Sequence, residues 1–159
     1  MLTPILYVRG DAANPAGAGI KIIAHCCNNL GVWGAGFVLA VSKYWPKAER
    51  DYRAWCKEEY QQGPPMGAVQ FSEVRDDVIV ANIIGQFGVG SRDGIPPIRY
   101  PALARGLDGV GAKARALQAT VHLPRLGCGL AGGEWSEVEP LIVAGISRRG
   151  VAAFVYDWP

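Results

Sequence analysis

The chain has 159 residues, of which 50% are hydrophobic and 19% are charged, and its formal net charge is +2. A chain of this length buries roughly 68–70% of its unfolded surface, so we expect one globular domain spanning residues 1–159. No apolar run approaches the roughly 20 residues of a membrane span, and the small net charge argues against a dedicated nucleic-acid surface.

Cysteine usage gives a further expectation about location and cofactors. The sequence contains four cysteines (Cys26, Cys27, Cys56 and Cys128) and two histidines. No CxxC pair and no metal-ligand spacing connects these residues, so we expect reduced thiols, no metal and no cofactor. The N-terminal residues lack the basic start of a secretory signal, and together these features predict a cytoplasmic protein. Nothing in the sequence indicates the oligomeric state.

Short apolar runs bounded by glycine, proline or charged turns predict six strands. In chain order these are residues 4–9, 20–24, 67–71, 78–84, 120–123 and 151–156. Between them, apolar residues at helical spacing predict helices that begin near Phe37 and Pro46, that include Leu103 to Leu117, and that begin again near Trp135. Strands alternating with helices predict a three-layer α/β/α sandwich with a mixed, mostly parallel sheet.

A glycine-rich loop follows the second predicted strand. The polar group His25 to Asn29 comes first, and glycines at positions 31, 34 and 36 then lead into the helix that begins near Phe37. In a strand–loop–helix layout, unpaired backbone N–H groups and the helix dipole face one point, which attracts anions. This pattern predicts a phosphate-bearing ligand, and the alternative is a tight turn with no ligand.

A second glycine-rich loop, residues 124–133, lies between the strand 120–123 and the last predicted helix. Two such loops could hold the two phosphates of a diphosphate from opposite sides through backbone N–H groups. Neither loop is a P-loop, because no Gly-Lys-Ser/Thr follows, and the first lacks the GxGxxG spacing of a dinucleotide-binding fold. The pair therefore predicts a diphosphate site of another kind.

Five motifs in this order resemble those of the macrodomain family over nearly the whole chain. They are Gly10-Asp11, His25-Cys-Cys-Asn28, Gly31-Val-Trp-Gly-Ala-Gly36, the segment Pro124 to Trp135, and Phe154-Val-Tyr156. The branch that the chain resembles most holds a yeast ADP-ribose-1''-phosphate phosphatase and an enzyme that removes ADP-ribose from glutamate esters. The resemblance implies binding of ADP-ribose or ADP-ribosylated protein, and hydrolysis of a glutamate or aspartate ester of ADP-ribose or of its 1''-phosphate. A non-catalytic reader of ADP-ribose is the alternative.

The resemblance also implies roles for individual residues. Asp11, beside the Ala12 N–H, would bind the adenine amino group, Tyr156 would pack on the adenine, and Asn28 would hold the distal ribose. The diphosphate would lie against the backbone amides of Gly34, Ala35, Gly36 and Phe37 and of Gly127, Cys128, Gly129, Leu130 and Ala131. Without a ligand, Asp11 is interpreted as a turn residue, Asn28 as a loop cap and Tyr156 as a half-buried strand aromatic.

Catalysis transfers less completely from the family. The lysine and aspartate of the glutamate-ester branch are replaced here by Gln86 and Ala131, so a lysine adduct is not expected. We predict instead that His25 orients or deprotonates water, because an imidazole titrates near neutrality, while Asn28 and Gln86 position that water. The alternative is that His25 only holds the loop.

A thiol nucleophile is a second hypothesis for the chemistry. Cys26, Cys27 or Cys128 would attack, with His25 as the activating base. Cys128 lies between glycines near a predicted helix N-terminus, a position that predicts a lowered thiol pKa. The simpler interpretation is that a small residue at this position lets the backbone approach a phosphate.

Overall fold

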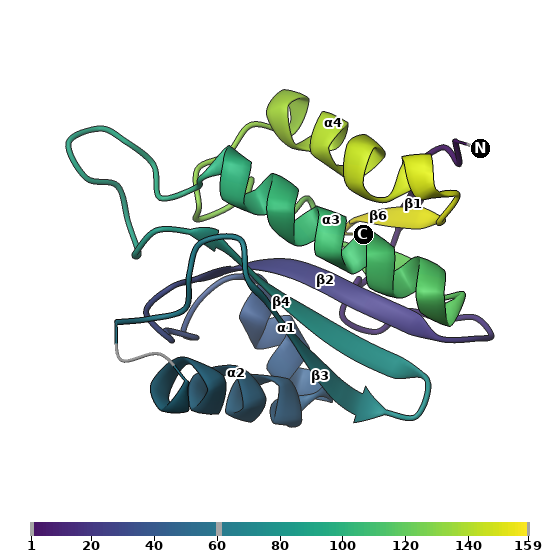
Figure 1. Ribbon diagram of the computed structural model, residues 1–159, viewed down its shortest axis with the longest axis horizontal. Coiled ribbons are helices and arrows are strands. Elements are labelled where there is room, and N and C mark those ends of the chain that lie inside the picture. The colour runs from purple at the N-terminus through teal and green to yellow at the C-terminus, as the bar shows by residue number, and fades with distance from the viewer. Residues whose placement is uncertain (1, 60–61, 159) are drawn as a thin grey trace.

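The computed structural model describes residues 2–59 and 62–158, which form a six-stranded sheet with helices on both faces (Figure 1). The elements are β1 (Leu6–Arg9), β2 (Lys21–Asn28), α1 (Phe37–Tyr44), α2 (Pro46–Glu58), β3 (Val69–Arg75), β4 (Val78–Gln86), α3 (Tyr100–Leu117), β5 (Thr120–Leu123), α4 (Trp135–Gly145), the 3₁₀ turn η1 (Ser147–Arg149) and β6 (Ala153–Asp157). No helix of these two ranges is long and apolar enough to cross a membrane.

The strand order is β1-β6-β5-β2-β4-β3, and every neighbouring pair is parallel except β3 and β4, which form an antiparallel hairpin. Parallel pairs need long crossover connections, and the helices supply them. Strands β2 and β4 lie in the middle of the sheet and are buried over almost their whole length. The predicted three-layer α/β/α sandwich with a mixed, mostly parallel sheet is confirmed.

Two apolar clusters fill the space on the two faces of the sheet. Alternate side chains of β2 point in opposite directions, so Ile22 lies in the cluster under α3 and α4, whereas Ile23 lies in the cluster under α1 and α2. Figure 1 shows the first pair of helices above the sheet and the second pair below it. The predicted face of α3 is buried from Leu103 to Ala114, which confirms its helical spacing.

Strand β2 is longer than the sequence predicts. The prediction placed its end at Ala24 and assigned the residues from His25 onward to a loop, which is wrong, because the strand continues to Asn28. The backbone of β2 keeps pairing with β4 up to Asn28 opposite Gln86, after a register shift between Cys27 and Asn28. His25 to Asn28 therefore form the carboxyl end of a central strand, and the loop begins after Asn28.

Lys21, at the other end of β2, is buried at 2% exposure. Its ammonium group donates hydrogen bonds to the carbonyl oxygens of Gly17 (2.9 Å) and Gly19 (2.8 Å), and to a carboxylate oxygen of Asp77 (3.1 Å). A buried charge is tolerated when it is paired and fully hydrogen-bonded. Lys21 thereby ties the segment after β1 to the β3–β4 hairpin.

Two glycines of α3 offer a matched test of how closely α3 and α4 approach. A Cβ at Gly111 would lie 1.9 Å from the Gly145 carbonyl oxygen of α4, whereas a Cβ at the exposed Gly109 would have its nearest neighbour 3.9 Å away. We expect Gly111→Ala to lower the free energy of unfolding by about 1–3 kcal/mol through steric conflict. Gly109→Ala should raise it by about 0.5–1 kcal/mol, because alanine favours a helix. Urea denaturation measures both, and equal effects would contradict the close approach.

Candidate functional site

A cleft of about 660 Å³ opens beyond the carboxyl ends of β2, β4 and β5. In open α/β sheets this edge is where ligands bind. The lining residues come from three segments, the end of β2 with the loop to α1 and the start of that helix, the end of β4 with the loop after it, and the loop after β5. They are His25, Cys26, Cys27, Asn28, Val32, Gly34, Ala35, Gly36, Phe37 and Val38; Gln86, Val89 and Gly90; and Pro124, Arg125, Leu126, Gly127, Gly129, Leu130 and Ala131. The tertiary structure thus brings both predicted glycine-rich loops to one cavity.

The first loop brings unpartnered backbone amides to the cleft. Gly36 is the N-cap of α1 and has a φ of 82°, a left-handed conformation that glycine adopts without strain. Among the described residues, no hydrogen bond is made by the backbone N–H groups from Gly34 to Val38. These groups and the start of the α1 dipole provide a site for a negative group.

The second loop presents a similar set of amides. Its turns are closed by backbone bonds from Gly132 N–H to Gly129 O (3.0 Å) and from Gly133 N–H to Gly127 O (2.7 Å). The N–H groups of Gly129, Leu130 and Ala131 have no partner within the described residues. A Cβ at Gly36 would lie 3.3 Å from the Leu130 side chain, so the two loops nearly touch over the cleft.

Arg125 is the one cation among the described residues that line the cleft, and its charge is already paired. The guanidinium Nε lies 2.6 Å from a carboxylate oxygen of Asp157. The same group lies over the rings of Tyr7 and Trp135, 5.4 and 4.9 Å from their centres. The cleft therefore offers an anion its backbone amides and no free cation among the described lining residues. Sequence reasoning missed the contact of Arg125 with two rings, because its members are far apart in the chain.

The Asn28 side chain supports the loop that follows it. Its carbonyl oxygen accepts hydrogen bonds from the N–H groups of Leu30 (2.9 Å) and Val32 (3.1 Å), and its amide nitrogen donates to Val32 O (2.7 Å). The Tyr52 hydroxyl of α2 donates to the Asn28 backbone oxygen at 2.5 Å. Asn28 lines the cleft with these bonds in place, and its contact with a ribose stays a prediction.

His25 also lines the cleft but is only 1% exposed. Its ring packs edge-on against Trp33, with ring centres 5.4 Å apart, and against Phe37 at 5.5 Å. Burial lowers the pKa of its imidazole from 6.5 to about 4, so His25 is neutral at pH 7. A neutral, enclosed imidazole is a weak proton acceptor, and the geometry favours a positioning role.

A chain of amide groups determines which nitrogen of His25 carries the proton. The Gln70 amide nitrogen donates to Phe71 O (3.0 Å), so the Gln70 side-chain oxygen accepts from the Asn82 amide nitrogen (2.8 Å). The Asn82 side-chain oxygen then faces His25 Nε2 at 2.5 Å. Nε2 must therefore be the protonated, donating nitrogen. Sequence reasoning missed Asn82 and Gln70, which lie within strands of apolar appearance.

Gln86 ends β4 beside Asn28 and lines the cleft. Its amide nitrogen donates to Gly88 O at 3.1 Å, while the Gly88 N–H donates to the Asn29 side-chain oxygen at 2.8 Å. The Gly88 peptide thereby joins the loop after β2 to the loop after β4. The Gln86 side-chain oxygen has no partner within the described residues, so it can accept a hydrogen bond.

Asp11, Ala12 and Tyr156 lie outside the lining of the cleft. The Asp11 carboxylate accepts a hydrogen bond from Ala13 N–H (2.9 Å), and Ala12 is buried. The Tyr156 hydroxyl lies 2.7 Å from His122 Nδ1, and a Cβ at Gly10 would lie 3.5 Å from the Tyr156 ring. These residues gather at the ends of β1 and β6, next to the Arg125 end of the cleft.

The thiols do not have the properties of nucleophiles. Burial raises the pKa of Cys26 to about 12 and raises that of Cys27 well above its ordinary value. Burial also raises the pKa of Cys128, so the lowered value predicted from its place near a helix start is wrong. No group of three or more His, Cys, Asp or Glu side chains within residues 2–59 and 62–158 could hold a metal ion.

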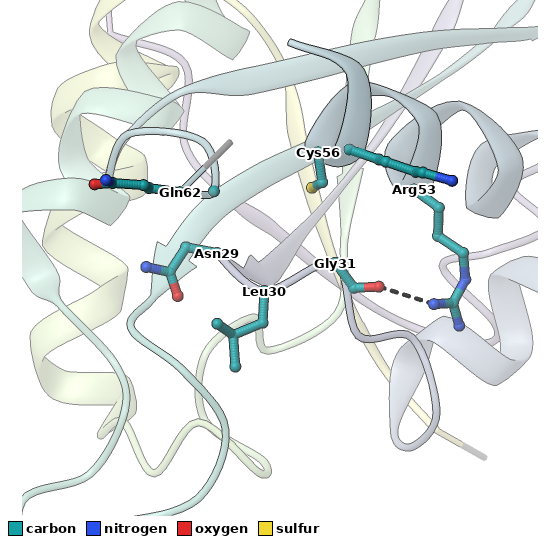
Figure 2. A pocket seen from close by; sticks show the side chains of 8 residues that line it. Asn29, Leu30, Gly31, Arg53, Cys56 and Gln62 are labelled. Carbon is teal, nitrogen blue, oxygen red and sulfur yellow. Dashed lines mark hydrogen bonds between the residues drawn. The ribbon is translucent and has the colours of Figure 1, made fainter. Parts of the chain in front are cut away.

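A second hollow, of about 680 Å³, is lined on one side by the segment Asn29 to Gly31 (Figure 2). Residues 28 and 32 line the cleft, whereas residues 29–31 line this hollow. Its other described lining residues are Arg53, Cys56, Lys57, Gln62 and Gly63. The two cavities therefore share one wall, a single stretch of the loop after β2.

The fold and the cleft define a class: an α/β/α sandwich with a cleft at the carboxyl edge of its sheet that is lined by the backbone amides of two glycine-rich loops. No protein-family model matches the chain. A solved macrodomain protein from Streptomyces coelicolor is 51% identical, covers 97% of this chain and 99% of its own, and superposes with a TM-score of 0.85. The chain belongs to the macrodomain family.

Other relatives are more distant. The ADP-ribose 1''-phosphate phosphatase of Lodderomyces elongisporus is 24% identical over 147 residues, 87% of this chain and 90% of that protein. The chromodomain-helicase-DNA-binding protein 1-like of Mus musculus is 28% identical, and the chain spans only 18% of its length. Thermosipho africanus DarTG in complex with ADP-ribose shares the fold, with 20% identity and a TM-score of 0.65 over 88% of this chain and 38% of its own.

Both histidines should stay neutral well below pH 6.5. Burial lowers the pKa of His25 and of His122 to about 4, helped at His122 by the charge of Lys21. Between pH 6.5 and 4 the unfolded chain binds protons that the folded chain does not. Lowering the pH through this window should therefore lower the free energy of unfolding, by up to about 1.4 kcal/mol per pH unit for each histidine.

The measurement is a nitrogen-15 NMR titration of the imidazoles, combined with urea denaturation at each pH. Two histidines give two sets of signals, and one should show a proton on Nε2 that persists at pH 5. An imidazole that titrates near pH 6.5 in the folded protein would contradict the buried, neutral state.

Proposed function

We propose that this macrodomain binds ADP-ribose and hydrolyses ADP-ribosyl linkages to oxygen, either esters of glutamate or aspartate or the 1''-phosphate. The observation that carries the proposal is the pair of unpartnered amide sets, Gly34–Val38 and Gly129–Ala131, which meet across one cleft. Amides that face each other suit the two phosphates of a diphosphate. The name of the Lodderomyces elongisporus relative supports ADP-ribose as the ligand class.

The proposed pose runs along the cleft from Arg125 to Gln86. The diphosphate lies between the two amide sets, and the Gly127 N–H extends the second. The Cys128 N–H already donates to Arg125 O at 3.2 Å, so Cys128 takes part only if that bond opens. The adenine lies beyond Arg125, where Asp11, the Ala12 N–H and Tyr156 gather. The distal ribose lies at the other end, where the register shift of β2 places Asn28 opposite Gln86.

The chemistry of the cleft favours linkages with good leaving groups. Among its described lining residues there is no Asp, Glu or Lys, and His25 is neutral. Such a site supplies little general acid catalysis. A carboxylate, with a pKa of about 4, leaves as a stable anion without being protonated, whereas a guanidine, with a pKa above about 12, does not. We therefore propose turnover of acyl and phosphoryl linkages and none of arginine-linked ADP-ribose.

In this scheme the Gln86 side-chain oxygen accepts a hydrogen bond from the attacking water. Water forms a bond from its oxygen to the anomeric carbon of the distal ribose. The bond from that carbon to the carboxylate or phosphate oxygen breaks with its electron pair on the leaving group, and the proton released by the water passes to a substrate phosphate oxygen or to solvent. His25 holds Phe37 and the floor of the cleft in place. A role for His25 as the base stays a prediction that its variant decides.

A reader without turnover is the second candidate function. One observation favours it. Arg125 is the one charged side chain among the described lining residues at pH 7, and it is paired with Asp157, so no free charged base or nucleophile faces the cleft. A reader would bind ADP-ribose with the same amides and release nothing. Substrate turnover separates the two functions.

Calorimetry and a substrate panel test the function. We expect ADP-ribose to bind and adenosine, which lacks the diphosphate, to bind at least about 100-fold more weakly, because charge-assisted hydrogen bonds contribute roughly 1.5–3 kcal/mol each. Glutamate-linked ADP-ribosylated protein and ADP-ribose 1''-phosphate should release ADP-ribose, and arginine-linked protein should not. Absence of heat with ADP-ribose would overturn the proposal, and binding without release would favour the reader.

Variants at Gln86 and His25 separate the roles at the distal end. Gln86→Ala should lower kcat about 10- to 100-fold with little change in ADP-ribose affinity, because the Gln86 side chain contacts the water and the Gly88 carbonyl but not the ADP-ribose of the proposed pose. His25→Ala should likewise reduce turnover more than affinity if His25 acts on the reaction. Equal losses of turnover and affinity for His25→Ala would assign it a structural role alone.

A further inference from the structure

The hollow behind the loop after β2 has features of a binding surface. Figure 2 shows Asn29, Leu30 and Gly31 along one side, with Arg53 and Cys56 of α2 opposite. Its volume of about 680 Å³ matches that of the cleft, yet the proposed pose of ADP-ribose leaves it empty. It can therefore receive a different part of a larger substrate.

The wall between hollow and cleft is thin and held in place. The Arg53 guanidinium donates a hydrogen bond to Gly31 O at 2.9 Å, drawn as the dashed line in Figure 2. A Cβ at Gly63 would lie 2.2 Å from Asn29 O, so the chain after α2 presses on the same wall. Leu30, 60% exposed, stands on this wall.

The hollow begins one residue away from the end of the cleft at which the distal ribose is proposed to lie. Asn28, at the proposed distal ribose, is followed directly by Asn29, which lines the hollow. Consecutive Cα atoms are about 3.8 Å apart, and an extended peptide spans roughly 3.3–3.6 Å per residue. A substrate peptide attached to the distal ribose therefore needs only a few residues to cross over Leu30 and enter the hollow.

The charge of the hollow is one-sided. Arg53 and Lys57 line it, and none of its described lining residues is acidic. Arg53 is paired with Glu49 at 2.8 Å, whereas Lys57 is exposed and makes no ion pair among the residues that the structure describes. No aromatic ring is among the described lining residues, which disfavours a single-stranded nucleic acid, because such chains bind by base stacking.

We propose that this hollow is the subsite for the acceptor chain, and that it takes an acidic peptide segment next to the ADP-ribosylated glutamate or aspartate. The inference rests on the proposed function, because it takes the orientation of ADP-ribose from that proposal. Lys57 provides the unpaired positive charge, and the Asn29 and Gln62 side chains supply hydrogen-bonding groups for the peptide. Free ADP-ribose does not reach the subsite.

Lys57→Glu and Arg148→Glu form a matched pair of charge reversals. Lys57 lines the hollow, whereas Arg148 is exposed in η1, the turn that follows α4 in the chain, and does not line it. The ligands are free ADP-ribose and an acidic peptide that carries ADP-ribose on one glutamate, measured by calorimetry at low salt. We expect Lys57→Glu to weaken peptide binding about 3- to 10-fold and to leave free ADP-ribose unchanged, with less than about 2-fold loss at 0.5 M salt. Arg148→Glu should change neither.

The remaining outcomes separate the inference from the function. If the wild-type protein binds neither ligand, the proposed function fails. If it binds both and Lys57→Glu weakens neither, the acceptor subsite is wrong while the function stands. Equal weakening of peptide binding by Arg148→Glu would show a general charge effect. If Lys57→Glu weakened the binding of an ADP-ribosylated oligonucleotide and not that of the peptide, the hollow would serve nucleic acid. Either result overturns the peptide proposal.

Discussion

The site depends on the pairing of β2 with β4 at the centre of the sheet. Both strands are buried, so their backbone groups must find partners in each other, and the ladder continues up to Asn28 and Gln86. The pairing ends with Asn28 opposite Gln86, after the register shift, and two loops leave the sheet from these neighbouring positions. The cleft, its amides and the wall shared with the second hollow all follow from where this ladder stops.

A second constraint is the polar row that the central strands carry into the core. His25, Asn82 and Gln70 are linked in series, and each link satisfies a group that would otherwise lose its hydrogen bonds to water. Such a row is stable only when every member has a partner. It holds the His25 ring against Trp33 and Phe37, which shapes the start of α1, while burial keeps the imidazole neutral.

Local patterns predicted the glycine loops well, because a glycine requirement is written into a few adjacent residues. The glycine spacing predicts that Gly34, Gly36 and Gly129 face one ligand, and all three line one cleft. The link from Asn29 to Gly88 and the ring contacts of Arg125 were not predictable. Asn29 and Gly88 are 59 residues apart, and the two rings over which Arg125 lies belong to separate elements, Tyr7 to β1 and Trp135 to α4.

The sequence by itself determined the layered α/β architecture, the buried face of α3 and the positions of both anion loops, since periodicity and glycine spacing act over a single element. Only the tertiary structure decided where β2 ends, which nitrogen of His25 carries the proton, and that Cys128 is a poor nucleophile. Each of these depends on burial and on partners brought from other strands. The pKa of a side chain and the end of a strand are properties of the surroundings, which no local pattern contains.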